Sequence, residues 1–183
     1  MHHRKFLALG FAICTAAAPF VSHLANAHSL PAQRRDKDYL SDAEADKIRD
    51  ADTPALRIKL FIGFAEDRLK KFDYELNRKV PEARRTEILN ALLNGYSGCV
   101  DDAADQLDVA KEKQMDIRDA LKMMKEKDQQ FLETLEKYDK GGAELDSYRE
   151  TLEDAIEGTK DALTDIADSE KEATPGPVRR KPS

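Results

Sequence analysis

The sequence of 183 residues predicts an all-α protein, built as an antiparallel helical bundle or hairpin array. Apolar residues recur at alternating spacings of three and four between residues 54 and 172, which places them along one face of a helix. Proline and glycine, which interrupt helices, fall mainly between these periodic stretches. Two of the stretches also begin with residues that cap helix N-termini. Together these three observations indicate helices throughout residues 39–172.

The first predicted helix is short and begins after Ser41. Ser41 and Glu44 have the spacing of a capping box, in which the two residues satisfy each other's free backbone N–H groups at the start of the helix. We expect this helix to end near Asp50, shortly before the next capping signal.

The second predicted helix begins at Thr53-Pro54 and runs to about Arg78. Thr53 suits the N-cap, and Pro54 suits the first helical position, where its missing N–H costs nothing. Two adjoining apolar rows run along this helix, one with Leu56, Leu60 and Phe64 and the other with Ile58, Ile62, Ala65, Leu69, Phe72 and Leu76. A stripe of this width indicates a face that is buried against more than one neighbour.

A long central helix is predicted over residues 82–139, after Pro81. No proline occurs within these bounds, and the core positions keep one heptad phase from one end to the other: Leu89, Leu93, Tyr96, Val100, Ala103, Leu107, Ala110, Gln114, Ile117, Leu121, Met124, Asp128, Phe131, Leu135 and Tyr138. Gly95 and Gly98 favour a kink, since each weakens a helix by roughly 1 kcal/mol relative to alanine. The polar run at 111–114 is the other candidate bend.

The last predicted helix follows Gly141-Gly142, a glycine-rich helix stop, and runs to about Glu172. This helix and the one at 54–78 together about equal the central segment in length, so each could fold back on half of it. We favour this elongated array because the heptad phase continues through residues 111–116. The wide apolar stripe favours the alternative, a bend at 111–116 that closes a compact four-helix bundle.

The charge of the chain is acidic and uneven, with 36 Asp and Glu residues against 30 Lys and Arg residues. Residues 54–100 carry 9 basic and 6 acidic groups, whereas residues 101–172 carry 11 basic and 23 acidic groups. This balance excludes nucleic acid as a partner, because phosphates require a basic surface. The acidic half is expected to be a solvated helix face, and attraction of cations or of a basic partner is the alternative.

We interpret residues 1–27 as a cleaved signal peptide, so the protein is expected to be exported and periplasmic or secreted. Arg4-Lys5 supplies the basic start, an apolar run follows, and Ala25 and Ala27 fit signal peptidase. A bilayer span needs about 20 apolar residues, more than this run offers, so we expect no integral membrane protein after cleavage, with an uncleaved anchor as the alternative. The remaining parts are a flexible linker at 28–38, a single helical domain at 39–172 and a disordered basic tail at 173–183.

Cleavage would remove three of the four histidines and one of the two cysteines, leaving His28 and Cys99. A single histidine argues against di-iron bundles, which need Glu-x-x-His pairs, against zinc sites, and against serine or cysteine nucleophiles that depend on a histidine base. Cys99 lies beside the apolar stripe, where we expect a buried thiol, and pairing between chains is the alternative. We therefore expect no cofactor and no enzymatic activity.

Carboxylates are the remaining candidates for a site. Asp101, Asp105 and Asp108 share one helix face and could lodge a cation, but calcium requires six to eight oxygens, so a solvated acidic face is the expectation. Gln114 and Asp128 take core positions of the heptad. Burial of an unpaired carboxylate is costly, so we expect both to be structural polar residues that set the register, with Asp128 paired or in reach of water.

A series of charged and apolar positions spans residues 39–69: Tyr39-Leu40, Glu44, Asp46-Lys47-Ile48-Arg49, Pro54, Arg57-Ile58-Lys59-Leu60, Phe64-Ala65 and Asp67-Arg68-Leu69. This series resembles a segment of predicted exported helical bacterial proteins, an uncharacterised family of unassigned function, and so implies no active site. In physical terms, the segment is a capped short helix braced against the following helix. Around this junction Arg49, Arg57 and Arg68 are expected to pair with Asp46, Asp52 or Glu66.

These features predict a non-enzymatic exported protein that works through its helical surfaces, as a scaffold, an adaptor or a chaperone-like binder. Its partner would be another protein or a second copy of the chain, bound through helical faces. The alternative is a helical bundle that binds a small molecule or a cation, in the acidic half or in a groove between helices.

Overall fold

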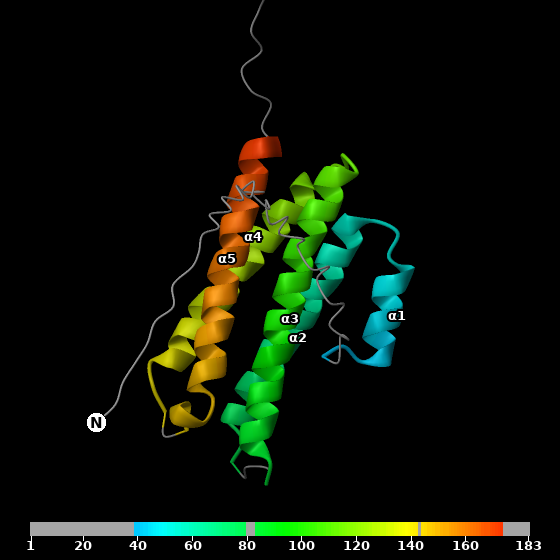
Figure 1. Ribbon diagram of the computed structural model, residues 1–183. Coiled ribbons are helices and arrows are strands. Elements are labelled where there is room, and N and C mark those ends of the chain that lie inside the picture. Colours follow the sequence, from blue (N-terminus) through cyan, green and yellow to red (C-terminus); the bar gives the residue numbers. More distant parts are fainter. Residues whose placement is uncertain (1–38, 80–82, 143, 174–183) are drawn as a thin grey trace, which may run out of the picture. The chain divides into compact units, whose positions relative to one another are not determined.

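The computed structural model describes residues 39–79, 83–142 and 144–173 (Figure 1). All regular structure in these ranges is helical, which confirms the predicted all-α fold. The predicted signal peptide, the predicted linker and Pro81 lie outside the described residues. So does the predicted tail, except for Ala173, which ends the last helix. The elements are α1 (Asp42–Asp50), α2 (Pro54–Leu76), α3 (Arg85–Glu112), α4 (Arg118–Asp139), the 3-10 turn η1 (Leu145–Ser147) and α5 (Arg149–Ala173).

The starts of α1 and α2 follow the capping signals of the sequence. Glu44 donates its backbone N–H to Ser41 Oγ at 3.4 Å, and Ser41 donates its own backbone N–H to Glu44 Oε2 at 2.9 Å, which completes the predicted capping box. At the start of α2, Thr53 Oγ1 accepts the N–H of Leu56 at 3.2 Å, and Pro54 is the first helical residue. Both starts are therefore confirmed.

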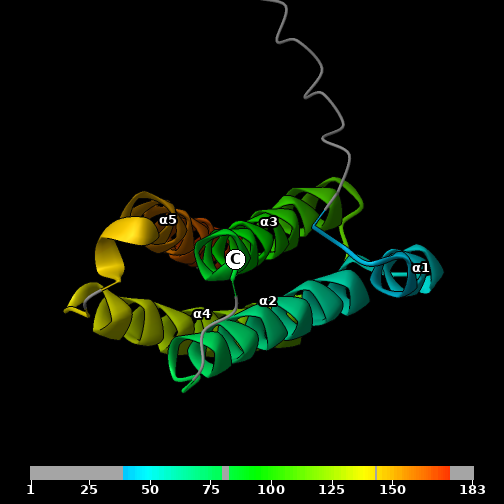
Figure 2. The ribbon, with the colours of Figure 1, turned by 90° about the horizontal axis from the view of Figure 1, so that it is seen from below.

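Helices α2, α3, α4 and α5 form a four-helix bundle, so the bundle alternative holds and the elongated array is wrong. Helix α2 packs against α3 and α4, and α5 packs against the same two helices from the other side (Figure 2). Ion pairs join the helices at the surface, between Glu66 and Lys127 at 3.0 Å and between Lys125 and Glu170 at 2.6 Å. Helix α1 lies outside this bundle and packs against α2.

The continuous helix predicted over 82–139 is also wrong, because the chain turns between α3 and α4. Gln114 adopts a left-handed backbone conformation with φ of 52°. The N–H of Met115 then bonds to the carbonyl of Ala110 at 2.9 Å, a pattern that closes the C-terminus of a helix. Gln114 is consequently exposed in the turn. The core position that the heptad predicted for Gln114 is therefore wrong.

The heptad phase nevertheless continues across the turn. Leu107 and Ala110 are buried before it, and Leu121 and Met124 are buried after it. The same phase therefore serves two helices that line one core, because the residues of the turn change the direction of the chain without displacing the pattern. Helix α3 is continuous from Arg85 to Glu112, so its two glycines do not interrupt it.

The remaining elements agree with the sequence in outline. Gly141 has a φ of 137°, which only glycine adopts readily, and it follows directly on the end of α4. Cys99 is fully buried on α3, as expected. No helix in the described part of the chain combines the length and the apolar content that crossing a membrane requires.

Candidate functional site

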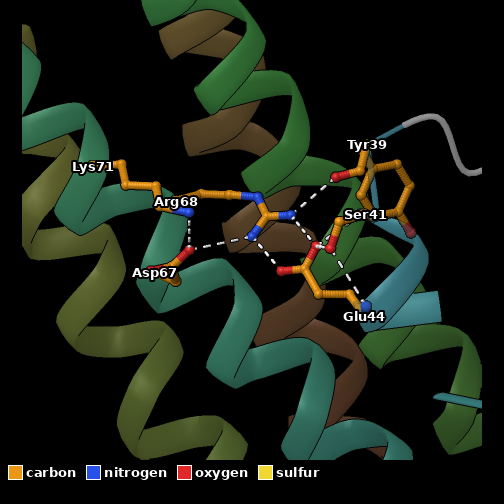
Figure 3. A network of polar contacts seen from close by, with 6 residues as sticks. All are labelled: Tyr39, Ser41, Glu44, Asp67, Arg68 and Lys71. Carbon is orange, nitrogen blue, oxygen red and sulfur yellow. Dashed lines mark hydrogen bonds and ion pairs between the residues drawn. The ribbon is translucent and has the colours of Figure 1, made fainter. Parts of the chain in front are cut away.

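A buried arginine on α2 joins α1 to the bundle (Figure 3). The guanidinium of Arg68 donates to both carboxylate oxygens of Glu44, with distances of 2.6 and 2.7 Å, and to the backbone carbonyl of Tyr39 at 3.0 Å. Bidentate pairs of this kind are among the strongest charge-assisted hydrogen bonds. Helix α1 contributes no fully buried residue, although Ile48 packs partly buried against the core. The polar attachment through Arg68, which we call the Arg68 clasp, holds α1 to α2 in addition.

Glu44 has two roles in the clasp. Its Oε2 accepts from the backbone N–H and the hydroxyl of Ser41, at 2.9 and 2.8 Å, while both oxygens accept from Arg68. The pKa of Glu44 falls from its ordinary value of 4.5 to about 2, chiefly because Arg68 stabilises the ionised form and despite the opposing effect of burial. The same carboxylate therefore caps α1 and attaches it to α2.

Of the two glycines of α3, only Gly98 is needed to make room for the residues of the clasp. A Cβ on Gly98 would lie 2.7 Å from Cε1 of the Tyr39 ring, too close for any other residue without movement of that ring. A Cβ on Gly95 would lie 3.6 Å from the Cγ of Arg68, in ordinary contact. The Tyr39 hydroxyl also donates to Asp102, one turn further along α3. Gly98 is thus required for close packing of the Tyr39 ring against α3.

An open apolar groove runs between α1 and the first half of α2. It encloses about 610 Å³ and is lined by residues of both helices, namely Lys47, Asp50, Ala51, Leu56, Lys59, Leu60, Gly63 and Phe64. Leu56 is 50% exposed, which is unusual for so large an apolar side chain in a row that continues into the core. The row of Leu56, Leu60 and Phe64, which predicted a second neighbour for this helix, forms the floor of the groove.

The interior of the bundle contains one isolated carboxylate. Asp128 on α4 is 0% exposed, and neither of its oxygens has a hydrogen-bond partner among the described residues. Tyr96 on α3 and Thr159 on α5 lie in the same core, with their hydroxyl oxygens 2.7 Å apart. Thr159 donates to the carbonyl of Ala155 at 2.7 Å, so the Tyr96 hydroxyl is the donor to Thr159 and its proton is already committed.

This burial changes the acidity of both titratable groups. Loss of hydration raises the pKa of Asp128 from its ordinary value of 3.8 to about 7. Burial, together with the nearby carboxylate of Asp128, raises the pKa of Tyr96 well above its usual range. The register predicted a buried position for Asp128, and the structure places it there, but without the pairing that we expected among the described residues.

The three aspartates that are weak candidates for a cation site lie on the surface of α3. Asp101, Asp105 and Asp108 are all exposed on α3, and Asp108 has Lys111 Nζ at 3.8 Å. Within the described ranges no group of three or more His, Cys, Asp or Glu side chains is close enough to hold a metal ion. These residues therefore occupy a solvated helix face.

The predicted arginine pairs are only partly correct. Arg49 pairs with Asp46 as expected. Arg57 donates instead to the carbonyl of Ala51 at 3.1 Å, and Arg68 binds Glu44 rather than the residues we named for it. In the sequence Glu44 is recognisable only as a capping residue, because nothing in a linear pattern marks a contact between residues 24 positions apart.

Comparison with known proteins finds no matching family description, no similar curated protein and no similar solved structure.

Proposed function

We propose that this chain is an exported, non-enzymatic protein that acts through its helical surfaces, and that the groove between α1 and α2 binds a partner protein. The observation that supports the proposal is the half-exposed Leu56 at the end of an apolar row. A helix row that is apolar but uncovered loses the free energy of burial, about 25 cal/mol per Å² of apolar surface. A partner that covers the groove would recover that free energy on binding.

Residue content supports binding over catalysis. After residue 27 the chain holds one histidine and one cysteine, and the cysteine is buried. The most perturbed carboxyl group among the described residues, Asp128, lies in the core rather than in the groove. The chain would then interact with other molecules mainly through the surfaces of its helices, which is consistent with a scaffold, an adaptor or a chaperone-like binder.

Site-specific crosslinking tests the proposal. A photoreactive p-benzoylphenylalanine at position 56 should crosslink to a discrete partner protein in cells that express the chain. The same group at position 74 is the control, because Tyr74 is also an exposed apolar residue of α2, at 66%, but does not line the groove. The partner, once purified, should bind the wild-type chain and lose at least tenfold in affinity for Leu56→Ser, but not for Tyr74→Ser.

Two results would contradict the proposal. Absence of any crosslink from position 56 would leave the groove without a function. Equal crosslinking from positions 56 and 74 would mean that contacts on α2 are not directed by the groove. Thermal unfolding of both serine variants serves as a folding control, since each replaced side chain is at least half exposed.

A further inference from the structure

We infer that the groove takes an amphipathic helix of the partner protein, with its apolar side chains on the α2 floor and acidic side chains facing Lys47 and Lys59. The inference rests on the proposed function and adds the kind of partner. It is drawn from three features of the groove: the direction of its floor, a glycine with open space above it, and the charge of its rim.

The floor of the groove has the spacing of a helix-binding surface. Leu56, Leu60 and Phe64 follow one another at intervals of four along α2, so their side chains form a ridge that is inclined by about 26° to the helix axis. Helix α1 lies beside this ridge and supplies the opposite wall through Lys47, Asp50 and Ala51. Two helices side by side form a trough into which a third helix packs, with axes about 8–10 Å apart.

Gly63 lies in the same trough, and no close contact among the described residues accounts for a glycine there. It is in the middle of α2, where glycine costs about 1 kcal/mol relative to alanine. A Cβ at this position would meet nothing within 4 Å, so no contact inside the described structure requires its absence. Gly98 on α3 differs in this respect, because the Tyr39 ring fills the space above it. The open space above Gly63 admits the close approach of another helix.

The rim of the groove is more basic than acidic. Lys47 and Lys59 are exposed and, among the described residues, neither has an ion pair or a hydrogen bond through its ammonium group. Asp50 is the one acidic residue of the lining. Acidic side chains on an incoming helix would pair with the two ammonium groups, whereas a basic helix would be repelled. A second copy bound through the same groove would place two lysine-bearing rims together, so self-pairing is disfavoured.

Two synthetic peptides test this inference. Both are amphipathic helices of about five turns with the same leucine row, flanked in one by glutamate and in the other by lysine, and circular dichroism is used to match their helicity. Fluorescence anisotropy on the purified protein should show at least tenfold tighter binding of the glutamate peptide. That preference should weaken as salt is added, because exposed charges are screened.

Charge-reversal variants show whether the two rim lysines cause the preference for the glutamate peptide. K47E/K59E should reverse the preference between the two peptides. The control is K122E/K160E, which makes the same change in net charge at two exposed lysines of α4 and α5 outside the groove and should leave the preference intact. Leu56→Ser should lower the affinity for both peptides alike, since it removes part of the apolar floor that both would contact.

Several outcomes would overturn the inference. Equal binding of the two peptides, or the same reversal in K122E/K160E, would show that the rim lysines do not select the partner. If neither peptide bound while crosslinking from position 56 succeeded, the groove would bind a protein of another kind, and the proposed function would stand without this inference. A dimer in sedimentation that dissociates in Leu56→Ser would identify a second copy as the occupant.

Discussion

Replacement of Asp128 by asparagine is the sharpest test of how the core is organised. In the native chain this carboxyl group is fully buried and has no hydrogen-bond partner among the described residues, and its pKa is raised from 3.8 to about 7. Asparagine is nearly the same size and cannot ionise. The substitution therefore removes the charge and leaves the packing of α4 against α3 and α5 almost unchanged.

The sign of the pH dependence follows from the direction of this shift. Because the folded state holds the Asp128 proton up to about pH 7 while the unfolded chain releases it near pH 4, the free energy of unfolding falls as the pH rises between these two values. The gap corresponds to about 4 kcal/mol in total, at 1.36 kcal/mol per pKa unit, and to about 2 kcal/mol between pH 5 and pH 7. The loss of stability is complete about one pH unit above the pKa of the folded state, because only there is Asp128 almost fully ionised in both states.

Urea denaturation followed by circular dichroism at pH 5, 6, 7 and 8 measures this dependence. The wild-type chain should lose stability across the range, whereas Asp128→Asn should be nearly flat and more stable than the wild type at pH 8. Asp105→Asn is the matched control, because Asp105 is exposed on α3. The range begins at pH 5 so that Glu44, whose pKa is about 2, remains ionised throughout. Equal pH dependence in the wild type and in Asp128→Asn would refute the reasoning.

Three further predictions concern the clasp and the turn. Gly98→Ala should displace the tyrosine ring above it and speed amide exchange in α1, whereas Gly63→Ala, with open space around it, should raise stability by up to about 1 kcal/mol. Arg68→Met should leave the Glu44 carboxylate without its main partner and lower the free energy of unfolding, measured by urea denaturation, by about 1–3 kcal/mol. It should also speed hydrogen exchange of the α1 amides. Gln114→Gly should stabilise the bundle by about 0.5–1 kcal/mol in thermal unfolding, because glycine adopts a positive φ without strain.

Each of these predictions has a result that would contradict it. Equal protection of α1 amides in the two alanine variants would mean that Gly98 is not a packing requirement. An Arg68→Met variant with wild-type exchange in α1 would place the anchor of that helix elsewhere. A Gln114→Gly variant less stable than the wild type would show that the turn depends on the glutamine side chain.

The sequence predicted the features that depend on near neighbours. The capping box of Ser41 and Glu44 and the Thr53-Pro54 start are local signals, and both helix starts are confirmed. The heptad placed Asp128 in the core correctly, because burial follows the periodicity of a single helix. Helix ends marked by glycine were also found, as at Gly141.

The features that the sequence did not reveal depend on the path of the chain. A heptad phase is the same for one straight helix and for two helices that line one core, so it did not mark the turn at Gln114. That residue is neither glycine nor asparagine, the usual signals of a left-handed backbone. The ion pair of Arg68 and Glu44 joins two separate helices, so no rule about the spacing of residues within one helix predicts it. Gly98 did carry a signal, since an unexplained glycine inside a helix also indicates close approach.

The double role of Glu44 has a consequence for how α1 moves. A helix of nine residues is too short to persist alone in water, where isolated helices of fewer than about 12–15 residues are marginal. If the hydrogen bonds between Arg68 and Glu44 break, the capping box at the start of α1 loses part of its support at the same time. Helix α1 then unfolds as it detaches from α2 and does not move as a rigid helix. Helix α1, which forms one wall of the groove, is therefore expected to unfold locally without the rest of the bundle. Binding of a molecule in the groove should then slow hydrogen exchange of the α1 amides.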